Sequence, residues 1–287
     1  MPVLDQLPVV SEKRMAVRVT PDARRQIAAG HPWIFNESIS SISHRGVVGD
    51  LAVIFDNDRN FVAIGLWDPG SPIRIRVLHH GKPATIDTAF WQQRIAAAVE
   101  RRAAIGDDTD GYRVLNGEND GFPGLVLDRY ADTLVLKLYS PVWIPHLRAI
   151  VDVIGEQFEP AALVLRLART MADQRLHGLT EGMALIGETP AAPVLFRENG
   201  LTFEADVVHG QKTGHFLDQR LDVRAQELER AVAGLANQVK VTRVAIGVFE
   251  AEPALAEIHL ARDAGFLHPQ QRAVDGGAAD AGIDTAH

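Results

Sequence analysis

Apolar and polar residues alternate over much of the first 80 positions, which predicts a series of short strands. The alternation covers 15–19 and 73–78, and in the second segment it places Arg74 and Arg76 on one face. Further apolar stretches, bounded by turn residues, lie at 33–35, 51–55 and 61–66. Several short strands separated by turns predict a small N-terminal β-barrel over residues 15–82, after a flexible N-terminus at 1–14.

One helix interrupts these strands. Thr20 is suited to cap its first turn, Pro21 fits the first helical position, and Gly30 ends it.

A mixed pattern follows and predicts a central α/β domain over residues 83–190. Residues 89–105 form an amphipathic helix, with Phe90, Ile95 and Val99 on its apolar face and Arg94, Arg101 and Arg102 on the other. Residues 112–139 indicate strands on either side of a glycine-rich turn at 116–124. A helix at 144–158 and a strand at 161–167 complete the unit.

The segment 194–208 predicts a β-hairpin. Asn199-Gly200 is a strong two-residue turn signal, and it sets Phe196 opposite Phe203. A helix is expected to begin near Gly214 because leucines recur at helical spacing, at Leu217, Leu221, Leu228 and Leu235. The hairpin and helix span 191–236, and we expect the low-signal tail at 237–287 to be poorly ordered.

Charge and composition narrow the functional classes. The 287 residues carry a net charge of −8, which argues against a protein that simply coats nucleic acid, but the first 105 hold 13 basic and 10 acidic residues. A local RNA-facing surface is therefore allowed there. No apolar run reaches the length of a membrane span, so we expect a cytoplasmic protein without a membrane partner. The chain has no cysteine, which excludes disulfides and thiolate nucleophiles.

The segment 209–220 is dense in chemistry. Two glycines flank Lys212-Thr213 just before the expected helix, so backbone amides and a lysine could hold an anion. The spacing does not fit a Walker A loop. The alternative is an ordinary capped helix, with Asp218 favouring the helix dipole.

Three carboxylates lie in or near the glycine-rich turn. Glu118, Asp120 and Asp128 could be metal ligands, but no histidine stands at ligand spacing. We favour a structural role, with no metal.

Three long motifs give the chain a resemblance to class I S-adenosylmethionine-dependent methyltransferases that make 5-methylcytidine in 23S rRNA of the large ribosomal subunit. The resemblance spans about 17–224. The motifs are GHPW at 30–33 with SPIRIR at 71–76, YRVLNGENDGFPGLVLDRY at 112–130, and GQKTGHFLDQR at 210–220.

The resemblance implies an α+β architecture with an N-terminal PUA-type barrel, a central α/β domain, and a hairpin and helix that enter an incomplete Rossmann-like domain. It implies that the PUA domain contacts RNA, through Gly30, His31, Trp33, Arg74 and Arg76. The alternatives are a solvated face for the two arginines and a core position for Trp33. It also implies that the element beside the S-adenosyl-L-methionine pocket comprises Lys212, Thr213, Gly214, Phe216, Asp218, Gln219 and Arg220.

Two requirements of cytosine-5 methylation are missing. The family's Gly-Gly loop and Asp-Pro-Pro segment are absent at their expected places, and so is the cysteine that must add to C6 of cytosine. Only 63 residues follow residue 224, whereas such a domain needs about 150. One hypothesis is a chain truncated or frame-shifted after about residue 224. The alternative is a non-catalytic RNA-binding protein with a genuine short tail. Either way we expect no catalytic residue here and little or no binding of S-adenosylmethionine.

An incomplete catalytic domain has a physical consequence. Without the sheet that the hairpin would adjoin, Phe196, Phe203 and Val207 are expected to expose an apolar patch. Dimerisation or aggregation through this patch follows as an expectation.

Overall fold

The structure is a computed structural model that describes residues 3–172 and 174–217. The expected helix beyond Leu217 and the tail at 237–287 lie outside the described residues. Within them, no helix is both long and apolar enough to cross a membrane.

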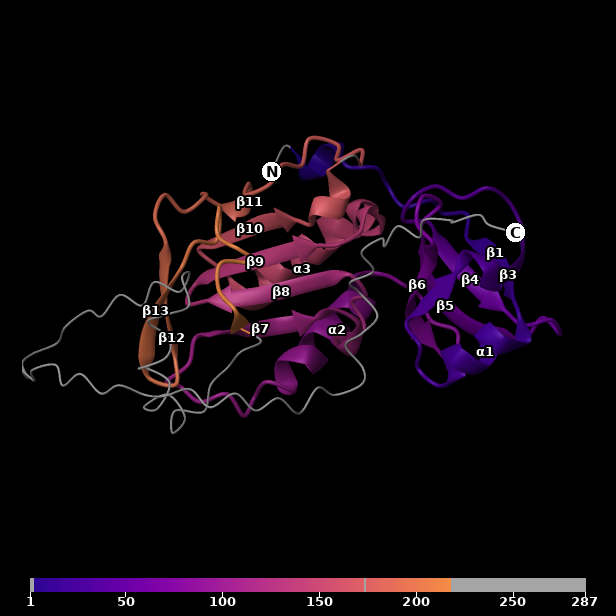
Figure 1. The fold of residues 1–287 in the computed structure, drawn as a ribbon, viewed down its shortest axis with the longest axis horizontal. Helices are drawn as coiled ribbons and strands as arrows, with labels where there is room; N and C mark the ends of the chain where they lie inside the picture. Colours follow the sequence, from indigo (N-terminus) through magenta and orange to yellow (C-terminus); the bar gives the residue numbers. More distant parts are fainter. Residues whose placement is uncertain (1–2, 173, 218–287) are drawn as a thin grey trace, which may run out of the picture. The chain divides into compact units, whose positions relative to one another are not determined.

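The N-terminal segment forms a six-stranded sheet, in the order β2-β6-β5-β4-β1-β3 (Figure 1). Its strands are β1 (Met15–Val19), β2 (Trp33–Phe35), β3 (Ile39–Ile42), β4 (Leu51–Phe55), β5 (Phe61–Trp67) and β6 (Ile73–His80). β1 alternates buried and exposed residues, as its sequence predicts. β3 was not predicted, because its sequence (ISSI) is short, half polar and largely exposed.

Helix α1 (Pro21–Ala28) confirms the expected cap. The hydroxyl of Thr20 accepts a hydrogen bond from the amide of Ala23, and Pro21 occupies the first turn, where no amide donor is needed. Gly30 follows the helix with a φ of +91°, a left-handed conformation that glycine adopts at little cost.

The central segment forms a five-stranded mixed sheet, in the order β11-β10-β9-β8-β7. Its strands are β7 (Gly111–Asn116), β8 (Leu125–Tyr130), β9 (Thr133–Leu138), β10 (Ala162–Leu167) and β11 (Ala184–Gly187). Helices α2 (Thr88–Glu100) and α3 (Leu147–Phe158) bury their apolar sides in one cluster with Leu134, Leu136 and Leu138. Short 3-10 helices lie at Leu4–Gln6, Asn36–Ser38, Gly117–Asp120, Pro141–His146 and Arg169–Met171.

Helix α2 differs from its prediction in length and in its buried face. It ends at Glu100 rather than at 105, because the following arginines turn toward Asp120. Its buried face comprises Trp91, Ile95 and Ala98. The side chain of Trp91 lies within 6 Å of the ring centroids of Phe122 and Trp143, so this tryptophan, absent from the predicted face, anchors the helix.

The predicted hairpin is confirmed by β12 (Val194–Glu198) and β13 (Leu201–Ala205), with Phe196 paired to Phe203 at a ring distance of 5.7 Å. Asn199 and Gly200 both have positive φ, as the turn requires.

The expected apolar patch is wrong. Phe196 and Val207 are each 1% exposed, because they pack on Tyr130, Val135 and Val164 of the central sheet. The ring of Phe196 seats against Gly111, where any Cβ atom would collide with it. The hairpin thus finds its apolar partner inside the described chain, which removes the physical basis for dimerisation through this face.

Candidate functional site

The face of the central sheet beneath the hairpin carries a group of charged side chains. Arg113 on β7, Asp128 on β8, Lys137 on β9 and Arg166 on β10 come from four neighbouring strands. The segment 206–217 lies over these side chains and is hydrogen-bonded to them. We call this segment the docked loop.

Asp128 is the fully buried centre of this arrangement. Its two oxygens accept hydrogen bonds from Nε and Nη2 of Arg113 at 2.8 and 3.1 Å. The hydroxyl of Thr213 donates to Oδ2 of Asp128 at 2.6 Å and lies 3.0 Å from the hydroxyl of Tyr130. Burial, and then the charge of Asp128, raises the pKa of Tyr130, so the phenol stays neutral. Thr213, 1% exposed, therefore fastens the docked loop to β8.

Two cations of the sheet bind backbone carbonyls of the docked loop. Arg166 donates to the carbonyls of Val207 and Gly210 at 3.1 and 2.7 Å. Lys137 donates to the carbonyl of Lys212 at 2.8 Å. Burial, and then the charge of Arg166, lowers the pKa of Lys137. The loop is held through its main chain as well as through Thr213.

The amides expected to hold an anion are partly used inside the loop. Gly210 and Gly214 donate to the carbonyls of Asp206 and Gln211, and the amide of His215 donates to the hydroxyl of Tyr130. A Cβ atom at Gly214 would lie 3.0 Å from the carbonyl oxygen of Asp206 and 3.2 Å from the side chain of Ala205, which is a tight contact. The amides of Gly210, Gly214 and His215 are therefore already bonded within the protein.

The remaining residues predicted to bind the cofactor are Lys212 and Phe216, together with three that lie outside the described residues, Asp218, Gln219 and Arg220. Lys212 has a φ of +55°, and its ammonium nitrogen lies 4.3 Å from the centroid of the Phe216 ring. Both side chains are half-buried.

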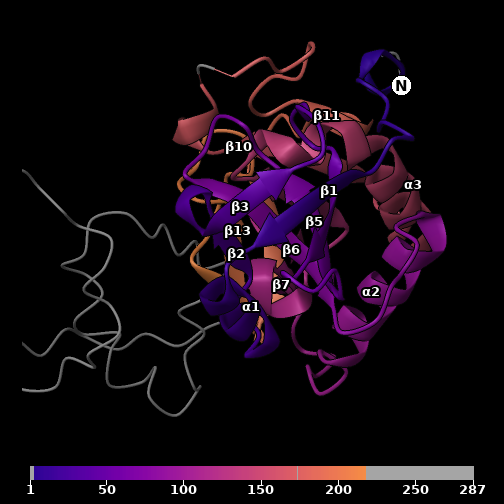
Figure 2. The same cartoon turned by 90° about the vertical axis from the view of Figure 1, so that its right-hand side faces the viewer.

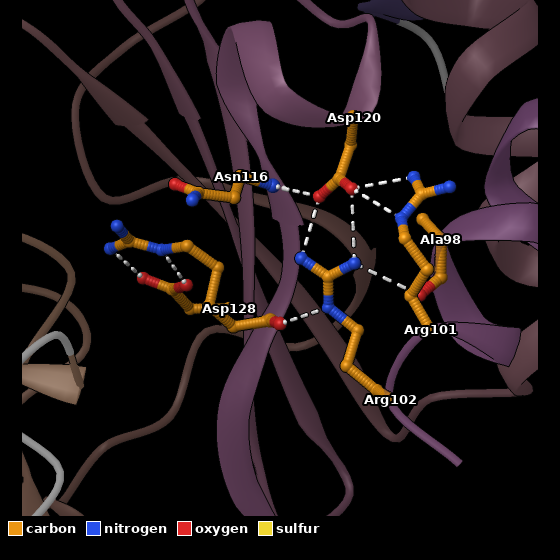
Figure 3. Close-up of polar contacts among 7 residues, drawn as sticks. Ala98, Arg101, Arg102, Asn116, Asp120 and Asp128 are labelled. Atoms are coloured by element: carbon orange, nitrogen blue, oxygen red, sulfur yellow. Dashed lines mark hydrogen bonds and ion pairs between the residues drawn. The ribbon is translucent and has the colours of Figure 1, made fainter. Parts of the chain in front are cut away.

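The carboxylates of the glycine-rich turn have structural partners. Asp120 lies between the guanidinium groups of Arg101 and Arg102, at 2.6 Å from each, and also accepts from the amide of Asn116 (Figure 3). Burial alone would raise its pKa, but the hydrogen bonds from Arg102, Asn116 and Arg101 hold the pKa of Asp120 below its ordinary value. In the described ranges, no three histidine or acidic side chains are grouped to hold a metal ion.

Trp33 connects the two sheets. Its indole nitrogen donates to Glu118 at 3.1 Å, and its ring is half-buried. His31 lies beside it, with Nδ1 at 2.9 Å from the carbonyl of Trp33 and the two rings edge to face. Gly30 is exposed next to them.

The two arginines predicted to contact phosphate are bound within the protein. Arg74 donates to the side chain of Asn36 at 3.0 Å and to the carbonyls of Asp68 and Pro69. Arg76 is 9% exposed and lies 3.5 Å from Asp68. Burial lowers the pKa of Arg76, while Asp68 and Glu118 raise it. Both guanidinium groups are thus hydrogen-bonded within the protein, and Arg76 is also buried.

Sequence reasoning missed Tyr130, Lys137 and Arg166. Lys137 and Arg166 each interrupt an apolar strand, which is a signal that something polar must cover that face. The partners are backbone carbonyls some 40 to 75 residues away, so the sequence does not identify them.

Comparison with known proteins identifies the domain to which the N-terminal sheet belongs. Residues 17–80 match the family model of the PUA-like domain. The six strands of the first sheet fall within or at the edges of this range.

Longer similarities involve methyltransferases. A "Ribosomal RNA large subunit methyltransferase" of Deinococcus radiodurans is 47% identical over 241 residues, which cover 82% of this chain and 58% of that protein. A "Ribosomal RNA large subunit methyltransferase I" of Shewanella frigidimarina is 35% identical, over 72% of this chain and 53% of that protein. The chain thus spans a little over half the length of the curated relatives it matches.

Solved structures show the same fold. A protein from Streptococcus mutans, assigned as a SAM-dependent methyltransferase, superposes with a TM-score of 0.61 over 75% of this chain and 54% of its own, at 16% identity. A second methyltransferase, solved in complex with SAH, gives a TM-score of 0.59 over 72% of this chain. The chain therefore has a PUA-like domain followed by an α/β segment, and it belongs to the family of large-subunit rRNA methyltransferases.

Proposed function

We propose that this chain belongs to the S-adenosylmethionine-dependent rRNA (cytosine-5) methyltransferases of the large subunit and supplies the part that holds RNA. The observation that carries the proposal is the 47% identity over 82% of the chain to the Deinococcus protein. A match of that length necessarily includes the central sheet and the docked loop. The PUA-like domain supports a role at RNA.

We further propose that these 287 residues do not complete the methyl transfer by themselves. Cytosine C5 is a poor nucleophile until a thiolate adds to C6, and the sequence contains no cysteine. The described atoms of the docked loop bind the chain's own Asp128, Lys137 and Arg166. For the family's activity, the proposed contacts of the methyl donor remain Lys212, Thr213, Gly214 and Phe216, with Asp218, Gln219 and Arg220 beyond the described residues.

The second candidate is a non-catalytic RNA-binding protein built from the PUA-like and central domains. The missing cysteine favours it. In both cases we place the RNA on the side of Gly30, His31 and Trp33, since Arg74 and Arg76 are held by their own chain.

Two assays on the 287-residue chain test the proposal. Tritiated S-adenosylmethionine and a large-subunit rRNA transcript are incubated with the protein, and nucleosides are then analysed for 5-methylcytidine. We expect none, and we expect calorimetry to detect no tight binding of the donor. We expect the same protein to bind the transcript in a filter assay. Formation of 5-methylcytidine would contradict the proposal that these residues do not complete the methyl transfer. Absence of RNA binding would contradict the proposed role in holding RNA.

The hypothesis of a changed reading frame near residue 224 has its own test. Translating the gene in all three frames beyond codon 215 either finds a frame with a Gly-Gly loop and a cysteine or does not. In the first case the family activity belongs to the longer reading, and in the second the RNA-binding role stands alone.

A further inference from the structure

A cavity of about 380 Å³ opens on the PUA-like sheet at strands β1, β3 and β4. It is lined by Ala16, Arg18, Ser41, Ile42, Ser43, Phe55 and Arg59. Its volume falls within the range of small-ligand sites. None of these residues belongs to the motifs at 30–33, 71–76, 112–130 or 210–220.

Strand register explains how the cavity forms. Arg18 on β1 lies opposite Ser41 on β3 and beside Phe55 on β4, so the three side chains form a row across neighbouring strands. Figure 2 shows β3 beside β1. Ala16 lies two positions before Arg18 on the same face of β1. Its side chain is only a methyl group, so it fills little of the space beside Arg18. Ile42 is 41% exposed at the rim.

The cavity is cationic. Arg18 and Arg59 are both exposed, and no ion pair within the described ranges involves either of them. Nearby arginines differ, since Arg24 lies 3.6 Å from Asp56 and Arg25 lies 2.8 Å from Asp22. Two guanidinium groups without a carboxylate partner at one cavity favour an anionic ligand.

The turn that presents Arg59 is built firmly. Asp56 accepts hydrogen bonds from the amides of Asp58 and Asn60 at 3.0 and 2.8 Å, and the side-chain amide of Asn60 donates to its second oxygen at 3.1 Å. This turn holds Arg59 at a φ of +65°. Glycine or asparagine would adopt that conformation at lower cost, and strained residues of this kind gather at functional sites.

We propose that this cavity binds an unpaired nucleotide of RNA, with its phosphate between Arg18 and Arg59 and its base against Phe55 and Ile42. The hydroxyl of Ser41 is the one proposed to bond the base edge, because the hydroxyl of Ser43 already accepts from the amide of Ala16 at 3.0 Å and lies 2.9 Å from Nδ1 of His44. Single-stranded RNA suits this set because its bases are free to stack on aromatic rings while arginines hold the backbone. The identity of the ligand as RNA rests on the proposed function, whereas the cavity itself does not.

The test uses the full 287-residue chain and a short, fluorescein-labelled single-stranded RNA, followed by anisotropy over a series of salt concentrations. The double variant Arg18→Gln/Arg59→Asn removes both charges. Asparagine suits the left-handed position, so the melting temperature should stay level or rise. The matched control is Arg175→Gln, an exposed arginine of the central segment.

We expect the double variant to bind more weakly, and the slope of log K against log salt to fall in magnitude by about 0.7, because the two arginines neutralise one phosphate between them. Phe55→Leu keeps an apolar side chain but loses the ring, and should weaken binding about fivefold or more. The control should bind like the wild type, and a duplex RNA should be insensitive to Phe55→Leu.

The outcomes separate the two proposals. If the wild type binds RNA and the double variant matches it in affinity and slope, the cavity inference is wrong and the proposed function stands. If the wild type binds no RNA, both fail. If a phosphopeptide of equal charge displaces the RNA at equal concentration, the cavity binds phosphate without selecting a base, which overturns the nucleotide assignment.

Discussion

Asp128 contacts two segments that are far apart in sequence, Arg113 on the neighbouring strand and Thr213 on the docked loop. A fully buried carboxylate is tolerated only where donors surround it, because an isolated charge in the interior is costly. Here the donors come from both sides, so one residue fixes the strand pair and the loop together.

Asp128→Asn should therefore destabilise the protein strongly. The variant keeps the shape of the side chain but removes the charge that faces the guanidinium of Arg113, and breaking a buried pair costs about 3 kcal/mol. Urea unfolding measures the loss. Asp152→Asn, in the exposed pair with Arg148, is the control and should leave the midpoint unchanged. Equal effects of the two substitutions would contradict the role of Asp128.

His146 predicts how stability depends on pH. It is buried, its Nε2–H donates to the carbonyl of Gly49 at 2.8 Å, and burial lowers its pKa below the ordinary 6.5. Below pH 6.5 the unfolded chain therefore binds a proton that the folded chain does not, and stability falls as the pH falls.

We expect the urea midpoint to decrease between about pH 7.5 and about pH 5.5, with a slope of up to about 1.4 kcal/mol per pH unit from this histidine. His146→Gln keeps a donor for Gly49 and should reduce the slope. His79 and His215, whose pKa values are also lowered by burial, supply the rest. An unchanged slope in the variant would show that His146 does not contribute.

At the scale of elements, the docked loop is a non-repetitive segment held to the sheet by both main-chain and side-chain hydrogen bonds. Its carbonyls at Val207, Gly210 and Lys212 are bound by cations of the sheet, and Thr213 adds a side-chain attachment. The loop therefore adds hydrogen-bond partners to charged residues of the sheet, of which Asp128 and Arg166 also have ion-pair partners outside the loop.

Thr213→Val should loosen this attachment. Valine has nearly the same volume but leaves Asp128 and Tyr130 without the hydroxyl, at a cost of about 1–2 kcal/mol. Hydrogen exchange should become faster at the amides of Gly210, Gly214 and His215, while β8 and β9 stay protected. Thr202→Val, on the exposed side of β13, should change nothing. Uniformly faster exchange across the sheet would contradict a local attachment.

Elements with a strong local signal were predictable. The Asn199-Gly200 turn fixes its hairpin through backbone conformation, and Thr20-Pro21 fixes the start of α1, so each depends on neighbouring residues alone. The end of α2 depends instead on Asp120, about twenty residues away, and β3 depends on pairing with β1. Such long-range determinants do not appear in local periodicity.

The candidate site also has parts that local sequence predicts and parts that depend on distant contacts. Sequence motifs drew attention to Thr213 and to the carboxylates near the glycine-rich turn, but their partners are set by the tertiary fold. Arg74 and Arg76 share a strand face as predicted, yet Asn36 and Asp68 meet them there. Arg18 and Arg59 are distant in sequence and form no motif. The register of β1 and the turn after β4 bring them to one cavity, which the sequence alone does not show.

At the scale of the whole molecule, one hydrophobic cluster joins the two sheets. Leu51, Ile64, Leu66 and Leu78 of the PUA-like segment lie in the same cluster as the core between the central sheet and its helices. A second cluster, with Val17 and Ile54, belongs to the PUA-like segment alone. The shared cluster makes the two sheets cooperate in unfolding.

Leu66→Ala tests this cooperation. Leu66 is fully buried in the shared cluster, and its truncation should cost about 3 kcal/mol and lower protection in both sheets. We expect circular dichroism and tryptophan fluorescence to report one coincident transition. Ile54→Ala is the control, with its first loss of protection confined to the PUA-like strands. Two separated transitions in the wild type would contradict a shared core.

Gly111 and Phe196 are about eighty residues apart in the chain but lie in contact. The aromatic ring of Phe196 packs directly on Gly111, which has only a hydrogen atom in place of a side chain. Neither residue can change alone: a methyl group at 111 collides with the ring, and a smaller side chain at 196 leaves a void. The two positions should therefore change together across relatives, so that a side chain at 111 accompanies a small residue at 196. This paired constraint would mark, in an alignment, every relative whose hairpin rests on the same sheet.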